Sequence, residues 1–200
     1  MPEGYTVVII GEGSVGKSAL CLQFVREVFS DEYNPTIEDT YNKTIQVDST
    51  SVTFNLIDTA GQEEYIALRE QYYLKGDGFV LVYSIDNKSS FMAIGSHKDS
   101  IETIRPEGQV ALILAGNKCD LVQERQVQTE EGKELAKEYG IDFFETSAAK
   151  RINVNELFIQ LGRKLLQIHN KGGDAGAPAG EEKKGKKDKG EKKKGGCTLL

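Results

Sequence analysis

The amino-terminal strand, loop and helix constrain the fold of this chain more than any other segment. A β-branched run in Tyr5–Ile10 leads into Gly11–Ser18, and the apolar-periodic stretch Lys17–Glu27 follows. The middle segment fits G-x-x-x-x-G-K-[ST], in which glycines let successive backbone N–H groups point inward at phosphate oxygens. Lys17 supplies a point charge for the β- and γ-phosphates, and the Ser18 hydroxyl suits Mg²⁺. These residues predict a phosphate-binding loop, whereas the alternative, an ordinary glycine-rich turn, needs no Lys-Ser pair.

Composition narrows the class of protein. The chain has 200 residues, enough for one domain with a substantial core, and three widely spaced cysteines, which indicate a reducing compartment without a disulfide framework. We expect neither a signal peptide nor a membrane-spanning segment. The net charge of −6 is uneven, because the final 30 residues carry nine lysines and five acids, which leaves the first 170 residues at −10. An acidic globule disfavours nucleic acid as its partner.

Strand and helix signals alternate along the chain. The expected strands are Tyr5–Ile10, Lys43–Val47, Val52–Ile57, Gly78–Ser84, Val110–Gly116 and Asp142–Glu145. The expected helices are Lys17–Glu27, Ala67–Lys75, Ser89–Ile104, Thr129–Tyr139 and Val154–Ile168. The second and third strands alternate apolar with polar residues, as in an antiparallel hairpin, and the others are apolar runs typical of buried parallel strands. The pattern predicts an α/β fold of the P-loop NTPase type, with a six-stranded, mostly parallel sheet, one antiparallel edge strand and five flanking helices.

The two ends of the chain differ in character. Residues 1–170 form the predicted globular domain, and residues 171–200, rich in Gly, Lys, Glu and Ala, are expected to be a disordered tail. Within the domain, Cys21 is expected on the side of a helix that faces the core. His97 and His169 have no metal-ligand spacing, so we expect them at the surface.

Four further segments carry polar residues suited to the chemistry of a phosphate loop. Asp58, after the third strand, is placed to hold Mg²⁺ through water, Gly61 can present its N–H to a γ-phosphate, and Gln62 can orient an attacking water. Thr36, after the first helix, offers a hydroxyl to the metal. The remaining two segments, which end the fifth and sixth strands, are Asn117–Asp120 and Glu145–Ala148.

Together with the phosphate loop, these segments resemble the small GTPases of the Ras family, from residue 5 to about residue 168. The resemblance implies a GTP/GDP switch with slow intrinsic hydrolysis. The catalytic residues it implies are Lys17, Thr36, Gly61 and Gln62, and the Mg²⁺ ligands are Ser18, Thr36 and Asp58. The implied nucleotide-binding residues are Gly13, Ser14, Val15, Gly16, Lys17, Ser18, Ala19, Phe29, Tyr33, Thr36, Gly61, Asn117, Lys118, Asp120, Ser147, Ala148 and Ala149.

The same resemblance assigns the reading of the base. It implies that Asp120 accepts hydrogen bonds from guanine N1–H and the 2-amino group, that Asn117 contacts N7, and that the Ala148 N–H meets O6. It also implies that Phe29 packs against the base and that Lys118 lies along it. Adenine offers Asp120 no donors, so ATP would leave a buried carboxylate unpaired, which disfavours the rival function of an ATP-dependent kinase.

An effector segment follows the first helix. It comprises Asp31, Glu32, Tyr33, Asn34, Pro35, Thr36, Ile37, Glu38, Asp39, Thr40 and Tyr41, and is nearly the segment that Ras and Rap share. Its acids are either a solvated rim or the means by which an edge strand selects a basic partner. Asp31-Glu32 and Gln62 are Ras-like, whereas Gly78–Ile85 and Ile152–Glu156 look Rap-like. We expect Ras-type signalling, with Rap-type signalling as the alternative.

Two positions depart from the family pattern. Ser14 stands inside the phosphate loop where Ras and Rap usually have glycine, so nucleotide affinity or the access of a catalytic arginine is expected to differ. Ala149 stands where a lysine usually follows Ser-Ala, with Lys150 one position later, so packing around the base is expected to be looser.

The tail ends in Cys197-Thr198-Leu199-Leu200, a C-a-a-X box that predicts lipidation of Cys197, with the final leucine favouring geranylgeranyl over farnesyl. One lipid beside a lysine cluster suits anchoring to an anionic cytoplasmic leaflet, at the plasma membrane or on endomembranes. The alternatives for these lysines are nucleic-acid binding or a soluble linker. Expected partners are an exchange factor, a GTPase-activating protein, Ras-binding-domain effectors and a prenyltransferase, and we expect a monomer. A GTP-dependent scaffold with negligible hydrolysis is the alternative function.

Overall fold

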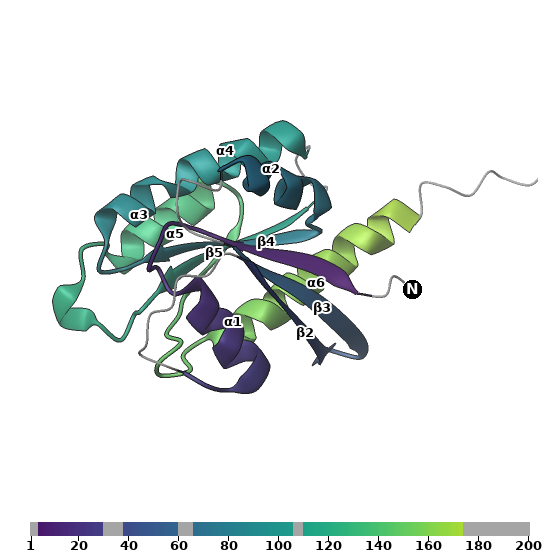
Figure 1. Cartoon of the computed structure of the whole chain (residues 1–200), viewed down its shortest axis with the longest axis horizontal. Helices are drawn as coiled ribbons and strands as arrows, with labels where there is room; N and C mark the ends of the chain where they lie inside the picture. Colours follow the sequence, from purple (N-terminus) through teal and green to yellow (C-terminus); the bar gives the residue numbers. More distant parts are fainter. Residues whose placement is uncertain (1–3, 30–37, 60–65, 106–109, 174–200) are drawn as a thin grey trace, which may run out of the picture.

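The computed structural model describes residues 4–29, 38–59, 66–105 and 110–173, which fold around one six-stranded sheet (Figure 1). The strands are β1 (Tyr5–Ile10), β2 (Glu38–Val47), β3 (Thr50–Thr59), β4 (Gly78–Ser84), β5 (Ala111–Asn117) and β6 (Asp142–Glu145), in the spatial order β2-β3-β1-β4-β5-β6. β2 pairs antiparallel with β3, and all other neighbours are parallel. This topology confirms the predicted fold class.

Helices connect the strands and cover both faces of the sheet. They are α1 (Lys17–Arg26), α2 (Ile66–Lys75), α3 (Lys88–Met92), α4 (Ile94–Ile104), α5 (Thr129–Glu138) and α6 (Val154–Gly173), with a 3₁₀ turn, η2, at Val122–Glu124. The five helical segments expected from the sequence are all helical. The third of them, Ser89–Ile104, is divided at Ala93, which keeps helical dihedral angles (φ −72°, ψ −15°).

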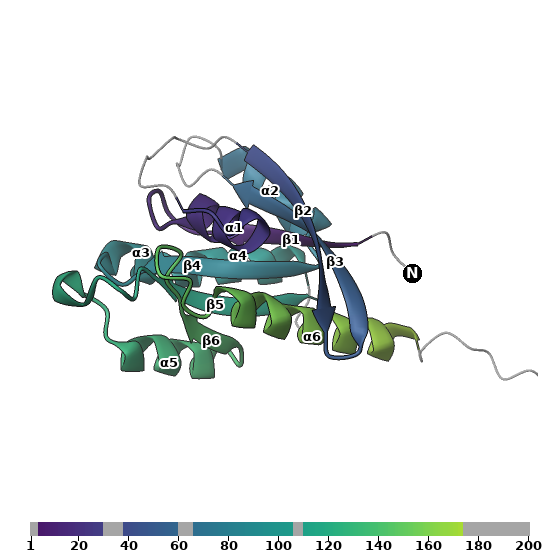
Figure 2. The same cartoon turned by 90° about the horizontal axis from the view of Figure 1, so that it is seen from below.

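Two hydrophobic clusters hold the helices on the sheet. Figure 2 shows α1 and α6 lying over the same face of the sheet. Successive residues of a strand point to opposite faces, so Val7 of β1 lies in one cluster and Val8 in the other. The first cluster packs α1 and α6 on the sheet, and the rings of Phe24 and Phe158 stack there at 3.8 Å between centroids. The second cluster packs α2, α4 and α5 on the opposite face. Because β1, β3, β4, β5 and β6 run parallel, the segments after their carboxyl ends gather at one edge of the sheet.

The hairpin is longer than the sequence predicted. β2 begins at Glu38 rather than Lys43, because its register with β3 runs from the Glu38–Thr59 pair to the Val47–Thr50 pair. The first five residues of β2 are polar or aromatic and mostly exposed, so they lack the apolar alternation that marked the expected strand. The turn is correspondingly tighter, and Asp48 takes a left-handed conformation (φ 53°).

The expectation that His97 lies at the surface is wrong. Its side chain is buried on the inner face of α4, and its Nε2 lies 3.5 Å from a carboxylate oxygen of Glu12 in the phosphate loop. Ile94, His97 and Ile101 share one helical face, and this i, i+3, i+7 spacing is the signal that the sequence offered. His169, by contrast, is exposed as expected.

Within the described ranges, every helix is too short or too polar to cross a membrane. α6 continues to Gly173, beyond its expected end at Ile168. Residues 174–200, including the lipidation candidate Cys197, lie outside the described residues.

Candidate functional site

The loop between β1 and α1 packs closely against residues of the neighbouring strands β4 and β5. Gly16, the residue before α1, has φ 92°, and a Cβ placed on it would lie 2.4 Å from the Asn117 side-chain nitrogen. Only glycine fits this position, because the position requires a left-handed backbone conformation and leaves no room for a Cβ atom. Val15 is completely buried and anchors the loop to the core. Gly13 and Ser14 lie at its outer side, where a Cβ on Gly13 would meet open space and Ser14 is exposed.

Lys17 lies inside the curve of this loop. The side chain is buried, and its ammonium donates hydrogen bonds to the carbonyl oxygens of Gly11 (2.9 Å) and Glu12 (2.8 Å). The loop backbone therefore holds a positive charge on its concave side. An ammonium in that position matches the role of a phosphate-binding lysine.

Asp58 lies beside the loop, one strand away. It is completely buried near the end of β3, where it pairs in register with Ile9 of β1. Burial raises the pKa of Asp58 to about 6, although the nearby Ser18 hydroxyl and Lys17 ammonium lower that pKa in part. Neither carboxylate oxygen has a well-formed hydrogen bond from a described residue.

This environment fits a divalent cation. A buried carboxylate with unsatisfied oxygens gains most from a nearby positive charge, and hydroxyl and carboxylate oxygens are the donors that Mg²⁺ prefers. Ser18 and Asp58 are therefore suited to hold Mg²⁺, the latter through water. Thr36, the third expected ligand, lies outside the described residues.

Asn117 connects the loop after β5 to the phosphate loop. It is buried, its side-chain amide donates to the carbonyl oxygen of Val15 (2.9 Å), and its side-chain oxygen accepts a hydrogen bond from Thr146 (3.1 Å). The Cys119 N–H donates to the Thr146 carbonyl oxygen at 3.0 Å. The segments after β5 and β6 thus form one hydrogen-bonded unit that contacts the phosphate loop.

Lys118 and Asp120 follow in the same loop. Lys118 has a left-handed backbone (φ 61°), and its ammonium lies 3.3 Å from a carboxylate oxygen of Asp86, the second residue after β4. Asp120 is half-buried, as a carboxylate that meets a ligand at a rim would be. The intervening Cys119 is half-buried, and burial is the main cause that raises the pKa of its thiol.

The loop after β6 is held from two directions. Ser147 forms an antiparallel bridge with Ile152, and its hydroxyl accepts a hydrogen bond from the Lys150 N–H (2.9 Å). The Ala148 carbonyl oxygen accepts a 2.6 Å hydrogen bond from Gln23 of α1. Ala148 is buried, whereas Ala149 is exposed.

The described part of the effector segment forms the exposed start of β2. Glu38, Asp39 and Thr40 are exposed and Tyr41 is half-buried. Glu38 accepts a 2.5 Å hydrogen bond from the hydroxyl of Tyr72 in α2. Burial and this hydrogen bond raise the pKa of Tyr72 to about 12, so the hydroxyl keeps its proton for the bond.

Two expected site residues that the structure describes lie outside the contacts given above. Phe29 is exposed shortly after the end of α1, and Ala19 lies in the first turn of that helix. The residues that lie outside the described ones are Asp31, Glu32, Tyr33, Asn34, Pro35, Thr36, Ile37, Gly61 and Gln62.

Three residues of this region were given no role from the sequence, although one of them, Thr146, lies in the predicted segment Glu145–Ala148. Gln23, Asp86 and Thr146 each make a hydrogen bond or ion pair to a predicted site residue. Gln23 offered a signal, because it is a polar residue between the buried residues Leu20 and Phe24 of a helix. Partners such as Asp86 and Thr146 become visible only when neighbouring strands are aligned.

The fold and this edge of the sheet define a P-loop nucleotide-binding protein. The sequence model of the Ras family matches residues 6–167. The chain therefore belongs to the Ras family of small GTPases, whose members bind guanine nucleotides and act as switches.

Proposed function

We propose that the chain is a Ras-type switch that hydrolyses GTP slowly alone and faster with a GTPase-activating protein. The gathering of Lys17, Asp58 and Asn117 at one edge of the sheet supports this proposal. The ammonium of Lys17 is held inside the phosphate loop, Asp58 is a buried carboxylate suited to a cation, and Asn117 joins the base-reading and phosphate loops. Phosphate, metal and base contacts would therefore be formed within one connected unit.

The proposed chemistry divides among residues of the chain. Lys17 exchanges its two carbonyl contacts for β- and γ-phosphate oxygens, and the loop N–H groups hold the remaining phosphate charge. Ser18, Thr36 and Asp58 hold Mg²⁺, which neutralises phosphate charge when bound. Gln62 orients the attacking water.

The proposed switch depends on the loss of contacts to the γ-phosphate. Thr36 and the Gly61 N–H hold their two loops against that phosphate before hydrolysis and are released after it. With GTP bound, the ordered surface Asp31–Tyr41 recruits effectors. The exposed edge of β2 supports this part of the proposal, because an edge strand can accept a partner strand and its acids favour a basic one. We propose Ras-type rather than Rap-type effectors.

We also propose that Cys197 is prenylated and that the lysines of residues 171–200 add attraction to an anionic cytoplasmic leaflet. A single lipid binds membranes only reversibly, so the lysines would supply the second signal that stable anchoring needs. The protein would then meet its exchange factor and effectors at the membrane.

The decisive experiment is single-turnover GTP hydrolysis with and without a Ras-type activating protein. Gln62→Leu should keep nucleotide affinity and lose the stimulated hydrolysis, because only the orientation of water is removed. Gln167→Leu, a change of an exposed glutamine on α6, is the matched control and should hydrolyse GTP normally. Negligible stimulated hydrolysis by the wild type would favour the scaffold alternative. ATP that competes with GDP at comparable affinity would favour a kinase.

A further inference from the structure

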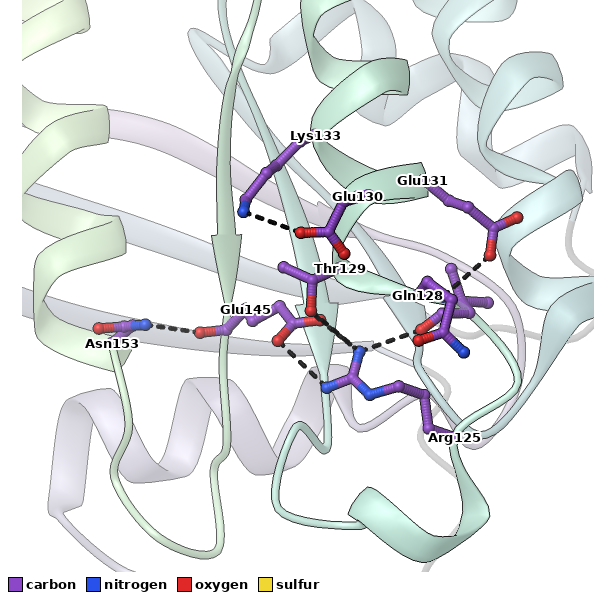
Figure 3. Close-up of polar contacts among 9 residues, drawn as sticks. Arg125, Gln128, Thr129, Glu130, Glu131, Lys133, Glu145 and Asn153 are labelled. Carbon is purple, nitrogen blue, oxygen red and sulfur yellow. Dashed lines mark hydrogen bonds and ion pairs between the residues drawn. The ribbon is translucent and has the colours of Figure 1, made fainter.

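A bidentate ion pair lies next to the two segments expected to contact the base, Asn117–Asp120 and Thr146–Ala149, but its residues are not among the expected binding residues (Figure 3). Arg125, between η2 and α5, contacts the carboxylate of Glu145 at the end of β6 through both terminal nitrogens (Nη1–Oε1 2.5 Å, Nη2–Oε2 3.2 Å). Only 15% of the Arg125 side chain and 19% of the Glu145 side chain are exposed. A pair with this geometry and burial is oriented far more rigidly than a surface pair.

Neighbouring groups fix both partners of the pair. Arg125 also donates to the Val127 carbonyl oxygen (3.0 Å), and the hydroxyl of Thr129, the first residue of α5, donates to Glu145 (2.9 Å). The carbonyl oxygen of Glu145 accepts a hydrogen bond from the side chain of Asn153 (2.7 Å). Figure 3 shows these groups converging on Glu145 from α5, the 125–128 segment and the loop before α6.

Glu145 is directly connected to the base-reading unit. The next residue, Thr146, contacts Asn117 through its hydroxyl and Cys119 through its carbonyl oxygen. A displacement of Glu145 would therefore move Thr146, and with it Asn117 and the segment that leads to Asp120. The Asn153 hydrogen bond spans the same loop in which Ala148 lies.

We propose that Arg125 and Glu145 are positioning residues that hold the Asn117–Asp120 and Thr146–Ala149 segments in the geometry that reads guanine, and thereby slow nucleotide release. The inference rests on the proposed function, since it assumes that these segments contact the base. Neither residue needs to touch the nucleotide. Removal of either partner would leave a poorly solvated charge, which the loop would relieve by moving Glu145 or Arg125 toward water.

The test compares the rates at which the full chain releases fluorescent GDP and fluorescent inosine diphosphate (IDP) in the presence of Mg²⁺. Hypoxanthine lacks the 2-amino group of guanine, so it tests the contact with Asp120, and the wild type should release IDP faster than GDP. Arg125→Gln should speed GDP release about tenfold but IDP release by less, because part of that contact is already absent. The IDP-to-GDP rate ratio should therefore fall at least about threefold. A pair that only stabilises the fold would speed both releases equally.

Two further variants test the pair as a unit. Glu145→Gln should reproduce the effect of Arg125→Gln, and the double variant should be no worse than either single change, because one interaction is lost in all three. Should Arg125→Gln fail to fold, Arg125→Lys should still lower the IDP-to-GDP rate ratio, since lysine keeps the charge but cannot make the bidentate contact.

Arg163→Gln is the matched control. Arg163 of α6 also makes a bidentate ion pair, with Asp48 in the turn between β2 and β3. β2 and β6 are the two edge strands on opposite sides of the sheet. Arg163→Gln should change both release rates less than about twofold. An unchanged ratio in Arg125→Gln and Glu145→Gln, with wild-type preference for GDP intact, would overturn the inference alone. Equal release of GDP and IDP by the wild type would contradict base reading itself and overturn both proposals.

Discussion

Replacing Asp58 by asparagine should stabilise the nucleotide-free, metal-free protein, although it removes a side chain of the site. Asp58 is completely buried, and its pKa rises from 3.8 to about 6 mainly because of that burial. Keeping the carboxyl ionised above that pH costs about 3 kcal/mol, from the difference of the two pKa values at about 1.36 kcal/mol per unit. Asparagine has nearly the same shape without the charge. Urea denaturation in EDTA near neutral pH should therefore show a free energy of unfolding higher by up to about 3 kcal/mol.

The pH dependence gives the sign of this effect independently. A carboxyl that binds its proton more tightly in the folded than in the unfolded state stabilises the fold at low pH. This contribution disappears as the pH rises from the unfolded pKa, 3.8, through the folded pKa, about 6. The amide introduced by Asp58→Asn cannot titrate, so the stability difference between variant and wild type should shrink by roughly half at about pH 5.

A matched control separates burial from loss of charge. Asp48→Asn removes an exposed carboxyl whose pKa is lowered by its hydrogen bond to Arg163, so this change should destabilise slightly rather than stabilise. With Mg²⁺ and GDP present the order should reverse for Asp58, because the ionised wild-type carboxylate then has a cation nearby. An Asp58→Asn variant that is no more stable than the wild type in EDTA, with a difference that does not vary with pH, would refute the raised pKa of Asp58.

Three other changes have definite expected outcomes. Asp120→Asn should weaken GTP binding and improve binding of xanthosine triphosphate, since an amide donor suits the 2-oxo group; a competition assay with unchanged preference would mean that Asp120 does not read the base. Ser14 is exposed with φ 62°, a conformation that costs a non-glycine residue about 1 kcal/mol, so Ser14→Gly should raise the melting temperature and slow GDP release; a release rate within twofold of wild type would mark the serine as a tolerated variation. Cys197→Ser should move the protein from the membrane to the soluble fraction of cells, and a variant that stays at the membrane would show that something other than a lipid holds it there.

Local patterns in the sequence predicted the fold class because each element carries its own signal. The phosphate loop needs Gly16, Lys17 and Ser18 at fixed spacing between a strand and a helix, and all three are contiguous. Buried parallel strands such as β4 and β5 are continuous apolar runs with both faces covered. The exposed first half of β2 had no such pattern, so its pairing with β3 was invisible until the two strands were in register.

Local motifs predicted which residues are suited to meet phosphate, metal and base, and the strand ends at which those residues lie. How these residues are supported depends on the tertiary structure. The Arg125–Glu145 pair, the Gln23 contact to Ala148 and the burial of His97 join residues from different elements. Such contacts depend on strand order and helix packing, which bring together side chains that no local period in the sequence connects. An unpaired buried charge or amide destabilises the fold, and the three-dimensional arrangement decides which of these groups find a partner.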